Sequence, residues 1–230
     1  MDLRVVDDPA QACAEILGAA AVAGGHIALT GGSAGKAYER AADAGEDWSA
    51  ATLWWGDERC VPPDDELSNF RLVREALIDR LPEERRPEVH RMRAERGPHA
   101  GADDYERELR DTLGEQRPRL DLVVLGMCPD AHVASLFPGR ATLRERDRLV
   151  VGEDEAGLDP FVPRVTLTLP MLRDARRIVF FVTGERKAEA AERSFGPREP
   201  SEEAPASLVR PSDGEMTVLL DEPAAARLQV

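Results

Sequence analysis

A histidine follows an aspartate by two residues, just beyond the most continuous apolar run of the chain. The run is LDLVVLG, residues 120–126, and the pair is Asp130 and His132. Such a run is typical of a strand covered on both faces, and ligands bind beyond the carboxyl ends of the strands in open parallel sheets. His132 could therefore act as a general base toward water, or it could be a structural histidine. If Asp130 caps a short helix, the helix dipole keeps the His132 ring uncharged.

Glycines and a serine follow another apolar run, residues 26–30. Gly31 and Gly32 would let the backbone approach an anion, and a helix that begins near Ser33 would offer free N–H groups to phosphate. A tight strand-to-helix turn with Ser33 as N-cap is the alternative. The segment fits neither the nucleotide P-loop pattern nor G-x-G-x-x-G, so no nucleotide cofactor is expected.

Three cations stand near the ends of other expected strands. Arg59 follows the run at residues 52–56, Arg164 precedes VTLT, and Lys187 falls in the first turn of a helix after FFVTG. The guanidinium of Arg59 could bind a phosphate while Asp57 orients it or contacts a hydroxyl, although a charged triplet is also typical of a solvated loop. Asn69 stands in the first turn of the next expected helix.

No second centre of chemistry is evident among the remaining residues. Ser135 lies in A-S-L rather than G-x-S-x-G, so a covalent acyl-enzyme is not expected. No His, Cys and Asp cluster has the spacing of a metal site, and neither metal nor cofactor is expected. The other histidines are His26, at the start of a strand, and His90 and His99, which are expected at the surface. The three cysteines, Cys13, Cys60 and Cys128, are odd in number and widely spaced, which predicts free thiols in a reducing cytoplasm.

The elements that must position these residues alternate short apolar runs with longer amphipathic ones. This pattern predicts an α/β fold: an open, mostly parallel, Rossmann-like doubly wound sheet with helices on both faces, in a single domain spanning residues 1–230. Strands are expected at residues 3–6, 26–30, 52–56, 120–126, 177–183 and 216–220, and helices at 9–23, 34–44, 67–81, 99–116 and 185–194. Residues 195–206, rich in Pro and Glu, are expected to form an exposed connection.

The composition limits the kind of partner. The 230 residues include 44 Asp and Glu against 30 Lys and Arg, a net charge of −14, and 42% are hydrophobic. This charge disfavours binding to nucleic acid or an anionic membrane, and no run reaches the roughly 20 apolar residues of a membrane helix. A local cation cluster can still bind an anion, because remote charges are screened within about 8 Å. We expect a small-molecule partner and a monomer or weak homo-oligomer.

The order of these segments resembles that of 6-phosphogluconolactonases over nearly the whole chain. D-E-R followed by S-N-F, and then D-x-H-x-A-S-L-F-P, carries most of the resemblance. It implies an α/β open sheet and the hydrolysis of the δ-lactone of 6-phosphogluconate without metal or cofactor. The segments are LTGGSAGKAYE (29–39), WWGDERCVPPDDELSNF (54–70), LDLVVLGMCPDAHVASLFPG (120–139), PRVTLTLPML (163–172), VTGERK (182–187) and PASLVRP (205–211).

The resemblance also implies roles for individual residues. His132 would be the base that activates water, with Asp130 orienting it or the substrate. Phosphate and hydroxyl contacts would come from Gly31, Gly32, Ser33, Asp57, Arg59, Asn69, Arg164 and Lys187.

The chain departs from the family pattern G-M-G-P-D-G-H at two positions, where Cys128 and Ala131 replace glycines. A glycine with positive φ would make alanine costly, by about 1 kcal/mol. We expect instead that Ala131 fits without strain, at the N-terminus of a helix. Cys128 is expected to be a small buried filler, and a thiol that points into the pocket is the alternative.

Two other functions remain open on this scaffold. Glucosamine-6-phosphate deaminases typically continue past the histidine with I-A-F-N-E-P, whereas residues 133–138 here read VASLFP. A non-catalytic sugar-phosphate sensor is normally preceded by a helix-turn-helix module, and the residues before the strand at 26–30 are acidic rather than basic.

Overall fold

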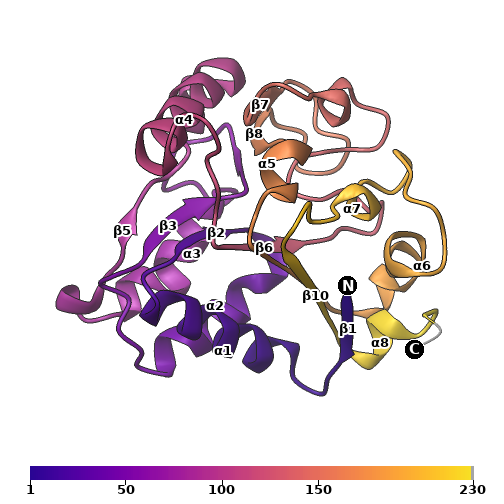
Figure 1. The fold of residues 1–230 in the computed structure, drawn as a ribbon, viewed down its shortest axis with the longest axis horizontal. Helices are drawn as coiled ribbons and strands as arrows, with labels where there is room; N and C mark the ends of the chain where they lie inside the picture. The colour runs from indigo at the N-terminus through magenta and orange to yellow at the C-terminus, as the bar shows by residue number, and fades with distance from the viewer. Residues whose placement is uncertain (229–230) are drawn as a thin grey trace.

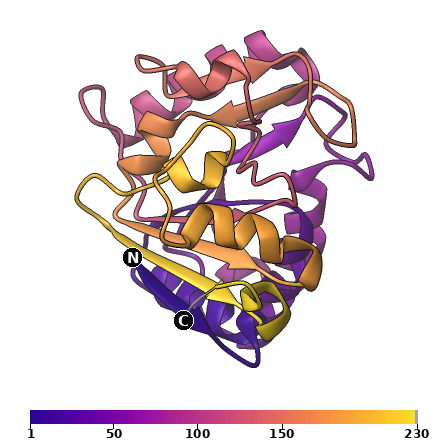
Figure 2. The same cartoon turned by 90° about the vertical axis from the view of Figure 1, so that its right-hand side faces the viewer.

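A seven-stranded parallel sheet forms the centre of the molecule in the computed structural model, which describes residues 1–228 (Figure 1). The strand order β1-β10-β9-β6-β2-β3-β5 places β6 and β2 in the middle, and edge strand β1 lies beside β10 (Figure 2). The parallel sheet confirms the predicted fold class. Its strands are β1 (Asp2–Val5), β2 (His26–Leu29), β3 (Thr52–Trp55), β5 (Glu88–Val89), β6 (Leu122–Gly126), β9 (Arg177–Val182) and β10 (Glu215–Leu220).

Helices cover both faces of the sheet, as predicted. α1 and α2 pack against each other below it in the view of Figure 1, and α5 and α7 lie above it. Side chains that accept backbone N–H groups begin several helices: Asp8 at α1, Ser68 at α3 and Asp221 at α8. The helices are α1 (Pro9–Val22), α2 (Gly35–Asp43), α3 (Asn69–Ala76), α4 (Pro98–Leu113), α5 (Leu169–Arg173), α6 (Ala188–Phe195), α7 (Pro205–Leu208) and α8 (Glu222–Ala225).

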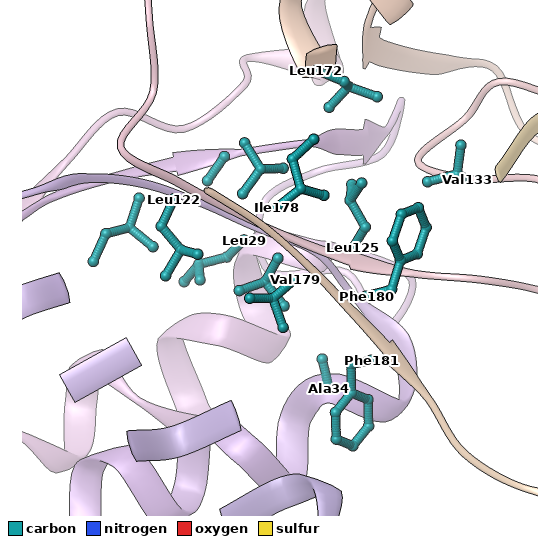
Figure 3. Packing of buried hydrophobic residues seen from close by; sticks show 14 of the residues in the cluster. Leu29, Ala34, Leu122, Leu125, Val133, Leu172, Ile178, Val179, Phe180 and Phe181 are labelled. Carbon is teal, nitrogen blue, oxygen red and sulfur yellow. The ribbon is translucent and has the colours of Figure 1, made fainter. Parts of the chain in front are cut away.

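The core lies on both faces of the central strands. In β9, Ile178 and Phe180 project to the face on which Leu172 lies, while Val179 and Phe181 project to the opposite face (Figure 3). These side chains are almost fully buried, because a parallel strand between two layers of helices presents no face to solvent. The continuous apolar runs of β6 and β9 therefore hold the site-bearing strand ends in a rigid frame.

A second, three-stranded antiparallel sheet was not predicted. It consists of β4 (Asp57–Arg59), β8 (Arg164–Leu167) and β7 (Val150–Glu153), in the order β4-β8-β7, and β7 and β8 lie above the main sheet in Figure 1. Of the two interpretations of the D-E-R triplet, the solvated loop is wrong, because β4 pairs with β8 and buries Asp57 and Glu58. In this register Arg59 stands directly opposite Arg164.

Other boundaries differ locally. The helix expected at residues 67–81 ends at Ala76, because Leu77 leaves helical geometry and only a 3₁₀ turn, Ile78–Arg80, follows. The three cysteines are free, as predicted. Within residues 1–228, no helix combines the length and apolar character that crossing a bilayer requires.

Candidate functional site

A small cavity of about 90 Å³ lies where β2 and β6 end at the carboxyl edge of the parallel sheet. It brings together every residue predicted for the site except Asp130, which contacts His132 from behind. Its lining consists of Thr30, Gly31, Gly32, Ser33, Asp57, Arg59, Asn69, Gly126, Met127, Cys128, His132, Ala134, Arg164 and Lys187. Ser33 and Lys187, which are 154 residues apart in the chain, thus meet at one sheet edge, as the topology requires.

The imidazole of His132 is held by Asp130. Its Nδ1 lies 2.8 Å from Asp130 Oδ1, which also accepts the backbone N–H of His132 at 3.1 Å. The ring packs against Phe137, with 4.5 Å between centroids, and its side chain is 12% exposed. Because the carboxylate occupies Nδ1, Nε2 is the nitrogen left to exchange a proton with a ligand or water.

The prediction of an uncharged His132 at a helix N-terminus is wrong. Residues 127–140 form no helix, so no helix dipole acts on the ring. Burial lowers the pKa of His132, but its hydrogen bond with Asp130 and the neighbouring Cys128 sulfur outweigh this and raise the pKa from 6.5 to about 9. Burial likewise raises the pKa of Asp130, but the hydrogen bonds from His132 outweigh it and hold that pKa below its usual value. The pair is a charge-assisted one in the free protein at neutral pH.

We expect Asp130→Asn to move the titration of His132 toward pH 6.5, because an amide stabilises the imidazolium less than a carboxylate does. Nuclear magnetic resonance of ¹⁵N-labelled histidine measures it: the wild-type ring should lose its proton near pH 9, and the Asp130→Asn ring more than one pH unit lower. Asp154→Asn, beside the exposed His99, is the matched control and should leave the His132 titration unchanged. Identical titration midpoints in wild type and Asp130→Asn would contradict this account of the pair.

The expectation that Ala131 fits without strain is also wrong. Its φ is +68°, in the left-handed region, and Ala134 has a φ of +50°. The loop is nevertheless held: the N–H of Ala131 donates to Cys128 O at 2.9 Å, and the N–H of Ala206 donates to Ala131 O at 3.0 Å. The family pattern therefore has glycine at this position because the backbone is left-handed, and not because space is short. The alanine of this chain costs about 1 kcal/mol there. Cys128 has an ordinary φ and is half-buried, with its side chain lining the cavity.

Ala131→Gly should raise the free energy of unfolding by about 0.5–1 kcal/mol, since relief of the left-handed strain exceeds the extra entropy of glycine in the unfolded chain. Urea unfolding followed by circular dichroism measures this change. Ala100→Gly, on the exposed side of α4, is the control, and its free energy of unfolding should fall by about 1 kcal/mol. A loss of stability in both variants would show that position 131 does not store backbone strain.

Among the residues that the structure describes, no carboxylate forms an ion pair with any of the three cations of the cavity. Within residues 1–228, their hydrogen bonds go to neutral oxygens: Arg59 Nη1 to Leu67 O at 2.6 Å, Lys187 Nζ to Ser33 Oγ at 3.3 Å, and Arg164 to two loop carbonyls, at 3.0 and 2.7 Å. Burial lowers the pKa of both Arg164 and Lys187. Two guanidinium groups directly across a strand pair repel each other, so the free site is a cation cluster that an anion would stabilise.

The glycine-rich turn lets the backbone approach the cavity. A Cβ on Gly31 would lie 1.9 Å from Asn69 Oδ1, and Gly32 has a φ of +70°, so neither position accepts another residue without strain. Ser33 is not the N-cap of α2; Ala34 occupies that position, and the Ser33 hydroxyl accepts from Lys187 instead.

Two buried side chains of the site were missed in the sequence. Glu58 accepts the N–H groups of Arg59, Asn69 and Phe70 and the hydroxyl of Ser68, and so fixes the start of α3; burial raises its pKa. Ser135, rejected as a nucleophile, donates to Asp57 Oδ2 at 2.7 Å. The position of Glu58 within D-E-R was a signal that could have identified it, whereas nothing in the sequence around Ser135 distinguishes that residue. His90, expected at the surface, is instead half-buried and stacked on Trp54.

The histidine–aspartate pair and the cation cluster lie together at the carboxyl edge of the sheet of a parallel α/β protein, an arrangement that suits a small anionic ligand. In residues 1–228, no group of three or more His, Cys, Asp or Glu side chains is placed to hold a metal ion. A family model described as glucosamine-6-phosphate isomerases/6-phosphogluconolactonase matches residues 4–218, and the chain belongs to this family. The resemblance noted in the sequence is thereby confirmed.

Curated relatives and solved structures agree with this membership. The chain is 37% identical to the 6-phosphogluconolactonase of Mycobacterium tuberculosis over 226 residues, which cover 92% of this chain and 89% of the relative. It is 39% identical to the human 6-phosphogluconolactonase over 180 residues, or 78% and 69% of the two chains. The solved 6-phosphogluconolactonase of Trypanosoma cruzi superposes with a TM-score of 0.83 at 27% identity, covering 100% of this chain and 97% of that one.

Proposed function

We propose that this chain is a 6-phosphogluconolactonase, which hydrolyses 6-phospho-D-glucono-1,5-lactone to 6-phospho-D-gluconate in the oxidative pentose phosphate pathway. This proposal rests on one observation: His132, held by Asp130, lines the same small cavity as three cations that have no carboxylate partner in the described part of the chain. The His132–Asp130 pair suits proton transfer to and from water, and the three cations suit a phosphate. The names of the relatives and the family membership support the same reaction.

In this mechanism the phosphate anchors the substrate and the imidazole moves the proton. Arg59, Arg164 and Lys187, with the turn at residues 31–33, would hold the phosphate. Neutral His132 would take a proton from water through Nε2 while the water oxygen attacks the lactone carbonyl carbon. Cleavage of the bond between that carbon and the ring oxygen then releases an alkoxide, which would take the proton back from the imidazolium. Neither a metal nor a cofactor takes part in these steps.

Asp130 would have two effects on this cycle. It keeps the ring oriented, with Nε2 free, and it stabilises the imidazolium that forms when water is deprotonated. Because the pKa of His132 is about 9 in the free protein, the neutral base becomes more abundant as the pH rises toward that value. We therefore expect kcat/KM, corrected for spontaneous hydrolysis, to rise with pH up to about 9.

The direct test generates the lactone in situ with glucose-6-phosphate dehydrogenase and follows its decay with and without the protein. Decay faster than the spontaneous reaction supports the proposal, and binding without acceleration would instead indicate a sugar-phosphate sensor. Ammonia release from glucosamine 6-phosphate is assayed in parallel. A turnover comparable with that of the lactone would replace the proposal with a deaminase.

We further propose that the protein works in the cytoplasm as a monomer or weak homo-oligomer, without nucleic-acid or membrane partners. The three free, widely separated cysteines suit a reducing compartment, and the net charge of −14 opposes contact with other polyanions.

A further inference from the structure

The sulfur of Cys128 lies among the charged groups of the cavity. Cys128 lines the cavity and is half-buried, and its backbone N–H donates to His132 O at 3.3 Å. Burial lowers the pKa of both Lys187 and His132, and the Cys128 sulfur acts in the opposite direction on each. The sulfur is therefore close to cavity groups from two parts of the chain, His132 after β6 and Lys187 after β9.

A buried arginine makes the same cavity favourable for an anion. Arg164 is only 4% exposed and lines the cavity, and its hydrogen bonds within residues 1–228 go to two loop carbonyls rather than to a carboxylate. A buried charge without a counter-charge is costly, so an anion that reaches Arg164 is stabilised there. Arg59 stands opposite Arg164 across the strand pair, and Lys187 adds a third positive charge. A small anion bound to these cations lies beside the Cys128 sulfur.

We propose that Cys128 is a modification site that reacts with small electrophiles carrying a carboxylate or a phosphate. The three cations raise the concentration of such reagents in the cavity, as charged clefts do for charged substrates. The sulfur attacks the electrophilic carbon, a carbon–sulfur bond forms, the leaving group departs with its bonding electron pair, and the thiol proton passes to solvent. The product places its own anionic group among the cations of a cavity of only about 90 Å³. Modification therefore closes the site to its ligand.

Cys60 is a matched control within the same chain. It is half-buried, as Cys128 is, but it is not part of the cavity lining. Burial raises the pKa of Cys60 to about 11, and its charged neighbours are Arg164 and three carboxylates. These carboxylates repel an anionic reagent, whereas the cations near Cys128 attract it. The third thiol, Cys13, is fully buried.

The test compares an anionic alkylating reagent, iodoacetate, with its neutral counterpart, iodoacetamide. Mass spectrometry after brief treatment gives the rate of alkylation at each cysteine, and the ratio of the iodoacetate rate to the iodoacetamide rate removes the contribution of each thiol's own reactivity. This ratio should be about tenfold higher at Cys128 than at Cys60, at the lower end of the gain that a charged cleft provides. Inorganic phosphate, added at constant ionic strength, should slow the alkylation of Cys128 and leave that of Cys60 unchanged.

Two variants test whether the cations are the cause. Arg59→Gln removes one charge of the cavity and should lower the ratio at Cys128 by about threefold. Arg71→Gln, which lies outside the small cavity and pairs with Glu75, should leave the ratio unchanged. Equal ratios at Cys128 and Cys60 in wild type, or no alkylation of Cys128 by iodoacetate, would overturn the inference.

Closure of the site is measured as a loss of binding. Fully alkylated wild type should bind 6-phosphogluconate at least about tenfold more weakly than the untreated protein, and Cys128→Gly should bind it equally before and after treatment. Unchanged affinity in the alkylated wild type would overturn the claim that modification closes the site. This binding test rests on the proposed function, but the alkylation ratios do not. A high ratio at Cys128 in a protein that does not accelerate lactone decay would refute the proposed function and leave the modification site standing.

Discussion

His132→Asn is expected to lower kcat for lactone hydrolysis by about 10²- to 10⁴-fold, the usual contribution of a general base. Asparagine can still contact Asp130 from this loop, but its amide cannot accept a proton from water at neutral pH. KM should change little, because the cations that would hold the phosphate stand on other elements. Stopped-flow decay of the enzymatically generated lactone measures both constants.

The matched control for this variant is His99→Asn. His99 is exposed and contacts Asp154 at the surface, so its replacement should leave kcat and KM at wild-type values. Circular dichroism confirms that each variant is folded. A folded His132→Asn protein that hydrolyses the lactone at the wild-type rate would remove His132 from the chemistry.

Arg59→Gln is expected to weaken the binding of 6-phosphogluconate by about 10- to 100-fold, the loss typical of hydrogen bonds between charged groups. The same change should not lower the free energy of unfolding, because it removes the charge that faces Arg164 across the strand pair. Replacement of a residue that serves binding rather than stability lowers the affinity without lowering the free energy of unfolding. Calorimetry with 6-phosphogluconate and urea unfolding provide them.

Gluconate, which has no phosphate, separates charge recognition from a general disturbance of the site. Its affinity should be the same for wild type and Arg59→Gln. Arg71→Gln is the matched control: this arginine lies on α3, outside the small cavity, and pairs with Glu75. An equal loss of affinity for the two ligands in Arg59→Gln would show that Arg59 supports the cavity rather than the phosphate.

The central strands could be predicted because burial on both faces leaves a continuous apolar signal in β6 and β9. Strand β4 could not, because its residues are Asp, Glu and Arg, and their burial depends on partners from β8 and α3. The two residues of β5 are too few to carry a pattern. The sequence therefore predicted the central parallel strands, whereas the second sheet depends on tertiary pairing between β4, β8 and β7.

The candidate site could also be predicted only in part. Residues after strand ends could be placed together, because parallel strands bring their carboxyl ends to one edge. The protonation of His132 could not be predicted, since it depends on the 2.8 Å contact with Asp130 in a loop rather than on a helix dipole. The left-handed φ of Ala131 could not be predicted from the residue type either, because alanine does not indicate that conformation.

A crystal structure of the His132→Asn variant with bound 6-phosphogluconate tests the central claim most directly. The account predicts the phosphate within about 3.5 Å of Arg59, Arg164 and Lys187, and the carboxylate carbon beside the side chain at position 132. A sugar acid bound elsewhere, or one whose phosphate lies on another surface while position 132 faces solvent, would contradict it.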